Sequence, residues 1–126
     1  MAKEKINILV VEDMRQLVDL HQRWIKMVGW ECRCFLTGTD ALAAFNNQND
    51  FDVIILDMVL PDISGAELFD QLRAINPEIP VIVCSGYSEE MNQMIDKKKI
   101  SIVSKPFNIM SLRDEVVALV EDAPCN

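Results

Sequence analysis

Apolar residues occur along this chain both in short continuous runs and in longer stretches with helical spacing. The short runs are rich in β-branched residues and predict strands at 6–12, 31–36, 52–57, 80–85 and 101–104. Because their apolar positions are continuous, these strands are expected to be covered on both faces of a sheet. The longer stretches predict helices at about 14–28, 39–48, 64–75, 88–97 and 108–121. Strand and helix therefore alternate five times, which favours an α/β fold with a doubly wound parallel sheet.

Capping and stop signals support the boundaries of the predicted helices. Ser64 and Glu67 have the S-x-x-E spacing of a capping box, and Pro61 keeps the preceding loop extended. Gly29 is a stop signal at the end of the first predicted helix, since glycine adopts the left-handed conformation without a steric penalty. His21 falls on the apolar stripe of the same helix and is expected to be packed, not reactive.

Four of the predicted strands end in residues that can bind a metal ion or a phosphoryl group. The first strand ends in Glu12 and Asp13 and the third in Asp57, while the fourth ends in Ser85 and the fifth leads into Lys105. Parallel strands bring their carboxyl ends to one edge of a sheet, where open α/β sheets bind ligands. Three carboxylates, a hydroxyl and an ammonium at that edge predict a site for magnesium and a phosphoryl group.

Each of these residues taken alone has a simpler explanation. Asp13 is placed to cap the first helix, and Glu12 is a candidate solvated loop charge. Ser85 alone is most often a turn residue, and Lys105 before a proline is usually just an exposed lysine. Asp57 is harder to explain in this way, because a carboxylate after five apolar residues is costly unless something compensates its charge. One shared site accounts for all five positions.

Taken together, these motifs resemble the receiver domain of bacterial response regulators over residues 6–121. The motifs that carry the resemblance are Ile-Leu-Val-Val-Glu12-Asp13, Val-Ile-Ile-Leu-Asp57 with Pro61 and Gly65 after it, Val-Ile-Val-Cys-Ser85-Gly, and Lys105-Pro106-Phe107. The resemblance implies a flavodoxin-like, five-stranded parallel sheet in the order 2-1-3-4-5 with five helices. It also implies one receiver domain that spans residues 1–126 and has its core at 6–121.

The same resemblance implies that Asp57 accepts a phosphoryl group from a phosphohistidine. The donor would be a sensor histidine kinase or a histidine phosphotransfer protein of a two-component or phosphorelay system. Glu12, Asp13 and Asp57 would hold Mg²⁺, and the backbone carbonyl of Val59 would be a further ligand. Such a domain is a signalling phosphoprotein that switches partner binding, and it catalyses only its own phosphorylation and slow dephosphorylation.

The remaining site residues implied by the resemblance are Ser85 and the Lys105–Pro106 pair. Lys105 would pair with Asp57 before transfer and with a phosphoryl oxygen afterwards, while Ser85 would donate its hydroxyl to another oxygen. Members of the family usually have a cis peptide before this proline. A cis Lys105–Pro106 bond is therefore expected.

The sequence departs from the family pattern at the position of a switching aromatic residue. Receivers commonly have Tyr or Phe three residues before the lysine, whereas this chain has Ile102. The usual coupling of hydroxyl movement to an aromatic rotamer cannot operate here, although Ile102 is also simply a good strand residue. Tyr87 and Val59 would restrict the access of water and give a long-lived phosphoform, unless Tyr87 is only a surface residue.

Composition limits the partners and the location. The formal net charge of −8 argues against direct nucleic-acid binding and against an anionic membrane surface. No apolar run approaches the roughly 20 residues that a membrane span needs, and the first residues are too polar for a secretory signal. The cysteines lack C-x-x-C spacing and are expected to be reduced, as in a cytoplasmic protein: Cys32, Cys34, Cys84 and Cys125.

Receivers often meet their downstream partner through the surface of the fourth helix, fifth strand and fifth helix. The basic cluster of Lys97, Lys98 and Lys99 falls there and would attract an acidic partner. A solvated helix end that complements the helix dipole is the simpler explanation.

Two other functions stay open. A magnesium-dependent phosphatase would also use Asp57 as nucleophile, but haloacid-dehalogenase-like enzymes need a second Asp where this chain has Val59. A degenerate receiver would bind partners without phosphorylation. Met1 is compatible with a regulator's own N-terminus, and the chain is either a stand-alone regulator or a domain of a larger regulator or hybrid kinase.

Overall fold

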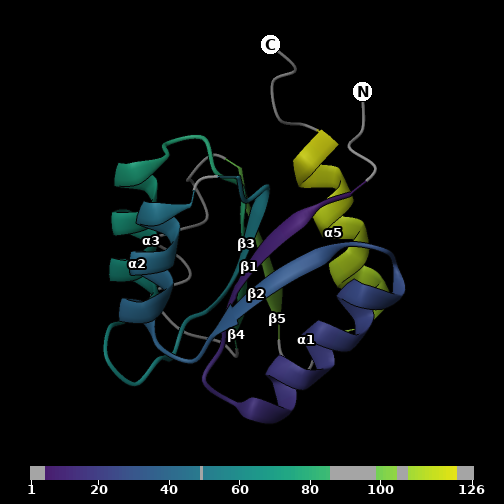
Figure 1. Ribbon diagram of the computed structural model, residues 1–126, viewed down its shortest axis with the longest axis horizontal. Helices are drawn as coiled ribbons and strands as arrows, with labels where there is room; N and C mark the ends of the chain where they lie inside the picture. Colours follow the sequence, from purple (N-terminus) through teal and green to yellow (C-terminus); the bar gives the residue numbers. More distant parts are fainter. Residues whose placement is uncertain (1–4, 49, 86–98, 105–107, 122–126) are drawn as a thin grey trace.

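A parallel sheet runs through the middle of the molecule, with helices on both faces (Figure 1). The computed structural model describes residues 5–48, 50–85, 99–104 and 108–121. The strands are β1 (Asn7–Val11), β2 (Glu31–Phe35), β3 (Val53–Asp57), β4 (Val81–Ser85) and β5 (Ile100–Ser104). The helices are α1 (Arg15–Met27), α2 (Gly38–Asn47), α3 (Gly65–Ile75) and α5 (Ile109–Glu121).

The predicted topology is confirmed. The strand order is β2-β1-β3-β4-β5, and every neighbouring pair is parallel. Four of the five predicted helices are observed, and the fourth predicted helix, at 88–97, lies outside the described residues. Within the part of the chain that the structure describes, no helix has the length and apolarity required to span a membrane.

The continuous apolar strands have a direct structural explanation. Figure 1 shows α2 and α3 on one face of the sheet and α1 and α5 on the other. Successive residues of β1 enter different cores: Leu9 and Val11 pack on the α2–α3 side, and Ile8 and Val10 on the opposite side. Both faces of the inner strands must therefore be apolar, which removes the alternation expected of a half-exposed strand. The edge strand β2 departs from the prediction, because its residues Glu31 and Arg33 are exposed.

The predicted helix boundaries are confirmed at two positions. Ser64 precedes α3, and its hydroxyl accepts a hydrogen bond from the backbone N–H of Glu67 at 3.2 Å. Gly29 follows α1 with φ of +87°, the left-handed conformation that ends a helix. His21 is buried, as predicted, and its Nδ1 accepts a hydrogen bond from Trp24 Nε1 at 3.1 Å.

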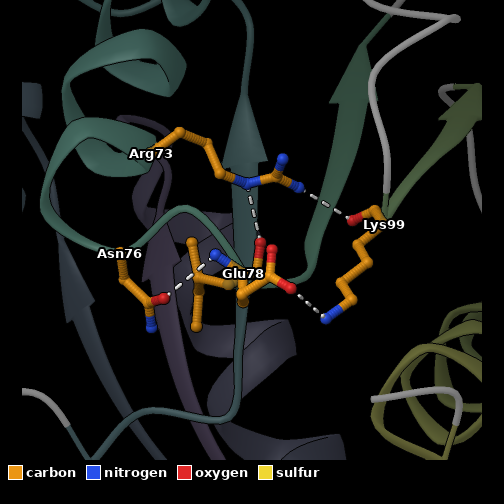
Figure 2. Close-up of polar contacts among 5 residues, drawn as sticks. Arg73, Asn76, Glu78 and Lys99 are labelled. Carbon is orange, nitrogen blue, oxygen red and sulfur yellow. Dashed lines mark hydrogen bonds and ion pairs between the residues drawn. The ribbon is translucent and has the colours of Figure 1, made fainter. Parts of the chain in front are cut away.

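One arginine ties α3 to the amino ends of β4 and β5 (Figure 2). Arg73 Nε donates to the carbonyl of Ile79 at 2.8 Å, and its Nη2 donates to the carbonyl of Lys99 at 3.1 Å. The guanidinium lies over the Phe69 ring, 4.7 Å from its centroid. Lys99 has φ of +53° and pairs through Nζ with Glu78 Oε1 at 3.4 Å. This Arg73 junction lies at the edge of the sheet opposite the carboxyl ends of the strands.

Of the predicted basic cluster, the structure describes only the last residue, Lys99. Lys99 lies in the turn before β5, and its ammonium is held by Glu78. Lys97 and Lys98 lie outside the described residues. Whether the cluster attracts an acidic partner therefore stays a prediction.

Candidate functional site

The carboxyl edge of the sheet brings together the three acidic residues predicted from the strand ends. Glu12 directly follows β1 and Asp57 is the last residue of β3, the neighbouring strand. The register pairs Val11 of β1 with Leu56 of β3, so the residues that follow them, Glu12 and Asp57, lie at the same height along the two strands. Carboxylate oxygens of Glu12, Asp13 and Asp57 all lie within 4.8 Å of one another. We call these three residues the acid cluster.

Backbone contacts hold Glu12 at the end of β1. Glu12 is only 2% exposed, and its N–H donates to the carbonyl of Phe35 at 3.0 Å. The carboxylate Oε2 accepts a hydrogen bond from the N–H of Met14 at 3.3 Å. The end of β2 thus supports the loop that carries Glu12, and the start of α1 orients its carboxylate.

Asp13 is exposed and does not cap the first helix. The residue before α1 is Met14, which makes no capping hydrogen bond with its side chain, and its carbonyl accepts from the N–H of Val18 at 3.0 Å. The explanation of Asp13 as a helix cap is therefore wrong. Its carboxylate lies instead beside Glu12 and Asp57.

The loop after Asp57 is shaped by a close approach of two backbone segments. Asp57 is 5% exposed, and its Oδ1 accepts a hydrogen bond from the N–H of Val59 at 3.3 Å. The Gly65 N–H donates to the carbonyl of Met58 at 3.0 Å, and a Cβ added at Gly65 would lie 2.6 Å from Met58 Cα. Only glycine permits this contact, which fixes the path of the chain directly after Asp57.

The donor set of the acid cluster suits a hard divalent cation. Mg²⁺ takes oxygen ligands at about 2.0–2.1 Å in an octahedral array, so neighbouring and opposite oxygens lie about 3 and 4.2 Å apart. Oxygens that already lie within 4.8 Å of one another are close to these separations. Two of the three carboxylates are buried, and a cation between them would offset the repulsion of like charges in a poorly solvated place.

The other predicted site residues are only partly described. Ser85 ends β4, next to the strand that carries Asp57, and is in register with Ser104 of β5. Both strand ends therefore reach the same edge as the acid cluster. Tyr87, Lys105 and Pro106 lie outside the described residues, so their roles and the cis bond stay predictions.

Ile102 lies in the middle of β5 and pairs in register with Val83. It is half-buried against the core on the α2–α3 side of the sheet. An aliphatic side chain therefore occupies the place at which the family commonly has a switching aromatic ring.

Asp62, which no sequence motif singles out, joins the loop after β3 to the start of α2. Its Oδ1 accepts from the N–H of Gly38 at 2.9 Å, and its Oδ2 accepts from the N–H of Thr39 at 2.8 Å and from the Thr39 hydroxyl. The Thr39 hydroxyl and the two N–H groups lower the pKa of Asp62 to about 2. No local pattern signals this contact, because its partners lie more than 20 positions away in the chain.

Comparison with known proteins identifies the family. Residues 8–117 match the model of the response regulator receiver domain. The chain belongs to this family. It is therefore a receiver domain of the two-component response regulator type, which is a class of signalling domains and not of enzymes.

Individual relatives agree with the family match. The chain is 31% identical over 108 residues to the probable transcriptional regulatory protein TcrX of Mycobacterium tuberculosis, covering 84% of this chain and 46% of that protein. It is 33% identical over 107 residues to the transcriptional regulatory protein CreB of Escherichia coli, covering 83% and 46%. The chain thus spans about half the length of these curated relatives.

The fold is also shared with solved receiver structures. A CheY-like response regulator receiver domain protein from Methanospirillum hungatei superposes with a TM-score of 0.88 at 23% identity. The match covers 94% of this receiver chain and 95% of that one. At this identity the likeness supports the fold alone.

Proposed function

We propose that this receiver domain accepts a phosphoryl group on Asp57 from a phosphohistidine of a sensor histidine kinase or histidine phosphotransfer protein. The observation that carries the proposal is the acid cluster, in which Asp57 lies at a strand end within 4.8 Å of two further carboxylates. An aspartate carboxylate is a competent nucleophile once charge on the incoming phosphoryl oxygens is neutralised.

Glu12, Asp13 and Asp57 are the residues that would hold Mg²⁺, and the backbone carbonyl of Val59 is a candidate further ligand. When bound, the ion neutralises charge on the phosphoryl oxygens during transfer. Within the chain itself, the Val59 N–H orients the Asp57 carboxylate, and the Met14 N–H orients that of Glu12.

Ser85 and Lys105 complete the proposed site. Both follow apolar strand residues that end at the edge occupied by the acid cluster. The Ser85 hydroxyl would donate to one phosphoryl oxygen, and the Lys105 ammonium would contact another after pairing with Asp57. Tyr87 and Val59 would slow the hydrolysis of the phosphoform by restricting water.

Phosphorylation would shift a conformational equilibrium of the domain and thereby change partner binding. The proposed output surface includes β5 and α5, and the proposed receiver unit is residues 1–126 with its core at 6–121. Two curated relatives are named as transcriptional regulators and are about twice as long as the matched segment. Any DNA binding would then belong to a separate part of such a protein and not to this acidic domain.

The proposal is tested by incubating the purified chain with Mg²⁺ and a small acyl-phosphate donor and recording the intact mass. We expect one phosphoryl adduct on the wild type and on Asp70→Asn, whose carboxylate is exposed on α3, but none on Asp57→Asn. Decay of the adduct then gives the lifetime of the phosphoform.

Two results would contradict the proposal. Absence of an adduct while Mg²⁺ still binds would indicate a receiver that works without phosphorylation. Continuous turnover of a phosphate ester without any adduct would indicate a phosphatase that uses the same carboxylates.

A further inference from the structure

Two thiols lie side by side on β2, at one edge of the sheet. The Sγ atoms of Cys32 and Cys34 are 3.9 Å apart and in hydrogen-bonding contact. Alternate residues of a strand project from the same face, which explains the contact. Both side chains are half-buried and neither forms a disulfide. The chemistry proposed for the acid cluster makes no use of this pair.

Both cysteines are partly exposed and line surface hollows. Cys32 lines a surface hollow of about 660 Å³ together with Lys26 and Arg33. Cys34 lines a second hollow of about 380 Å³ together with Arg15. Small polar oxidants can enter hollows of this size, whereas Cys84 is buried at 1% exposure in the sheet core.

The contact makes the two thiols chemically unequal. The side-chain contact with Cys34 lowers the pKa of Cys32, against the opposing effect of burial. The side-chain contact with Cys32, together with burial, raises the pKa of Cys34. The pair thus consists of a nucleophilic sulfur and a second thiol within reach of it. Redox-reactive cysteines combine low pKa, accessibility and a resolving partner in this way.

We propose that Cys32 and Cys34 form an oxidation site at which a hydroperoxide converts the two thiols into an intrachain disulfide. The Cys32 thiolate attacks the peroxide, so that an S–O bond forms, the O–O bond breaks and the released oxyanion takes up a proton. Cys34 then loses its proton and attacks Cys32 Sγ. The S–S bond forms as the S–O bond breaks, and water leaves; the two thiols lose two electrons and the peroxide gains them.

The position on an edge strand makes this reaction feasible and reversible. Two residues of extended strand span about 6.6 Å, near the upper limit of about 6.8 Å between Cα atoms joined by a disulfide. β2 must therefore bend as the bond forms, and it can do so because it is the end strand of the described sheet, paired with β1 on one side. Strained disulfides have higher reduction potentials, so reduction by a small dithiol is expected to be easy.

Trypsin provides a direct test, because Arg33 lies between the two cysteines. A Cys125→Ser variant is treated with hydrogen peroxide, alkylated, denatured and digested without reduction. We expect peptides 27–33 and 34–73 to remain joined by one disulfide, since each contains a single cysteine. Dithiothreitol added before alkylation should separate them, and the undigested protein should run as a monomer on a non-reducing gel.

Paired single variants test the separate roles of the sulfurs. In Cys34→Ser, Cys32 should accumulate as a sulfenic acid that a dimedone-type reagent traps. In Cys32→Ser, Cys34 should react more slowly, with less trapped adduct at equal exposure to peroxide. Equal labelling of the two variants would contradict the assigned roles.

Any of three results, obtained with protein that retains both Cys32 and Cys34, would overturn the proposal. Cys32 could remain alkylatable under conditions that oxidise glutathione. Cys32 could be oxidised to sulfinic acid while no disulfide-linked pair of tryptic peptides is detected. The linked peptides could also derive from two chains, seen as a dimer on the non-reducing gel.

Discussion

Asp62 shows how one exposed carboxylate can hold two loops together. It accepts hydrogen bonds from the N–H groups of Gly38 and Thr39, which open α2 and have no intrahelical partner. Because Asp62 belongs to the loop that follows Asp57, the same contact positions the chain beside the acid cluster. The helix N-terminus favours the ionised form, in agreement with the lowered pKa of Asp62.

This contact should make stability depend on pH in a defined window. The pKa of Asp62 falls from 3.8 to about 2 on folding, so the ionised carboxylate stabilises the fold above pH 3.8. That stabilisation is lost as the pH falls toward 2. We expect the difference in free energy of unfolding between wild type and Asp62→Asn to be constant above about pH 5 and to shrink between pH 4 and 2. Urea titrations across this range measure it; a difference that does not change with pH would contradict the assignment.

Among the elements, α3 is joined to the sheet at both of its ends. Its start approaches the backbone of Met58 through Gly65, and near its end Arg73 bonds to the carbonyls of Ile79 and Lys99. Burial lowers the pKa of Arg73, and nearby Glu78 opposes this effect. A planar guanidinium satisfies two carbonyls and stacks on the Phe69 ring at once, which a lysine ammonium cannot do.

The Arg73 junction therefore predicts a large effect from a nominally conservative change. Arg73→Lys should lower the free energy of unfolding by about 1–2 kcal/mol, because one carbonyl bond and the ring contact are lost. Urea denaturation of the purified variants measures this change.

Arg113→Lys is the matched control, since Arg113 lies on α5 with a side chain that is 39% exposed and pairs with neighbouring Asp114. Its effect should stay within about 0.5 kcal/mol, as is usual for surface changes. Similar losses in the two variants would indicate that Arg73 contributes only as a surface charge.

At the scale of the whole molecule, the acid cluster opposes folding when no cation neutralises it. Three carboxylates within 4.8 Å of one another repel, and two of them are removed from water. The formal net charge of −8 adds to this repulsion. Repulsion among these carboxylates costs free energy of folding, and a bound divalent cation would reduce that cost, which is typical of a functional site.

Neutralising one carboxylate should therefore stabilise the metal-free protein. Without Mg²⁺, we expect Asp57→Asn to raise the free energy of unfolding by on the order of 1 kcal/mol, since Val59 N–H can still bond to the amide oxygen. Adding Mg²⁺ should stabilise the wild type through preferential binding to the folded state and stabilise Asp57→Asn less.

Thermal unfolding with and without Mg²⁺ measures both effects, and Asp70→Asn on the exposed side of α3 serves as the control. If Mg²⁺ raised the melting temperatures of all three proteins equally, binding at the acid cluster would be excluded as the cause.

Much of the fold was predictable because its signals are local. The continuous apolar runs predicted buried parallel strands, and Ser64 and Gly29 predicted helix ends that are observed. Convergence of Glu12 and Asp57 could also be predicted, since parallel strands in one sheet end at a common edge. The explanation of Asp13 as a cap failed because the residue before α1 is Met14, one position later in the chain.

The sequence by itself determined the alternation of strands and helices, the two-sided burial of the sheet and the residues that its carboxyl edge would present. These follow from periodicity and from strand direction, which neighbouring residues encode. Only the tertiary structure decided that Asp62 would hold α2, that Arg73 would join α3 to β4 and β5, and that the strand carrying Cys32 and Cys34 would lie at the edge of the sheet. The strand order and the packing of the layers set these arrangements, so no stretch of neighbouring residues specifies them.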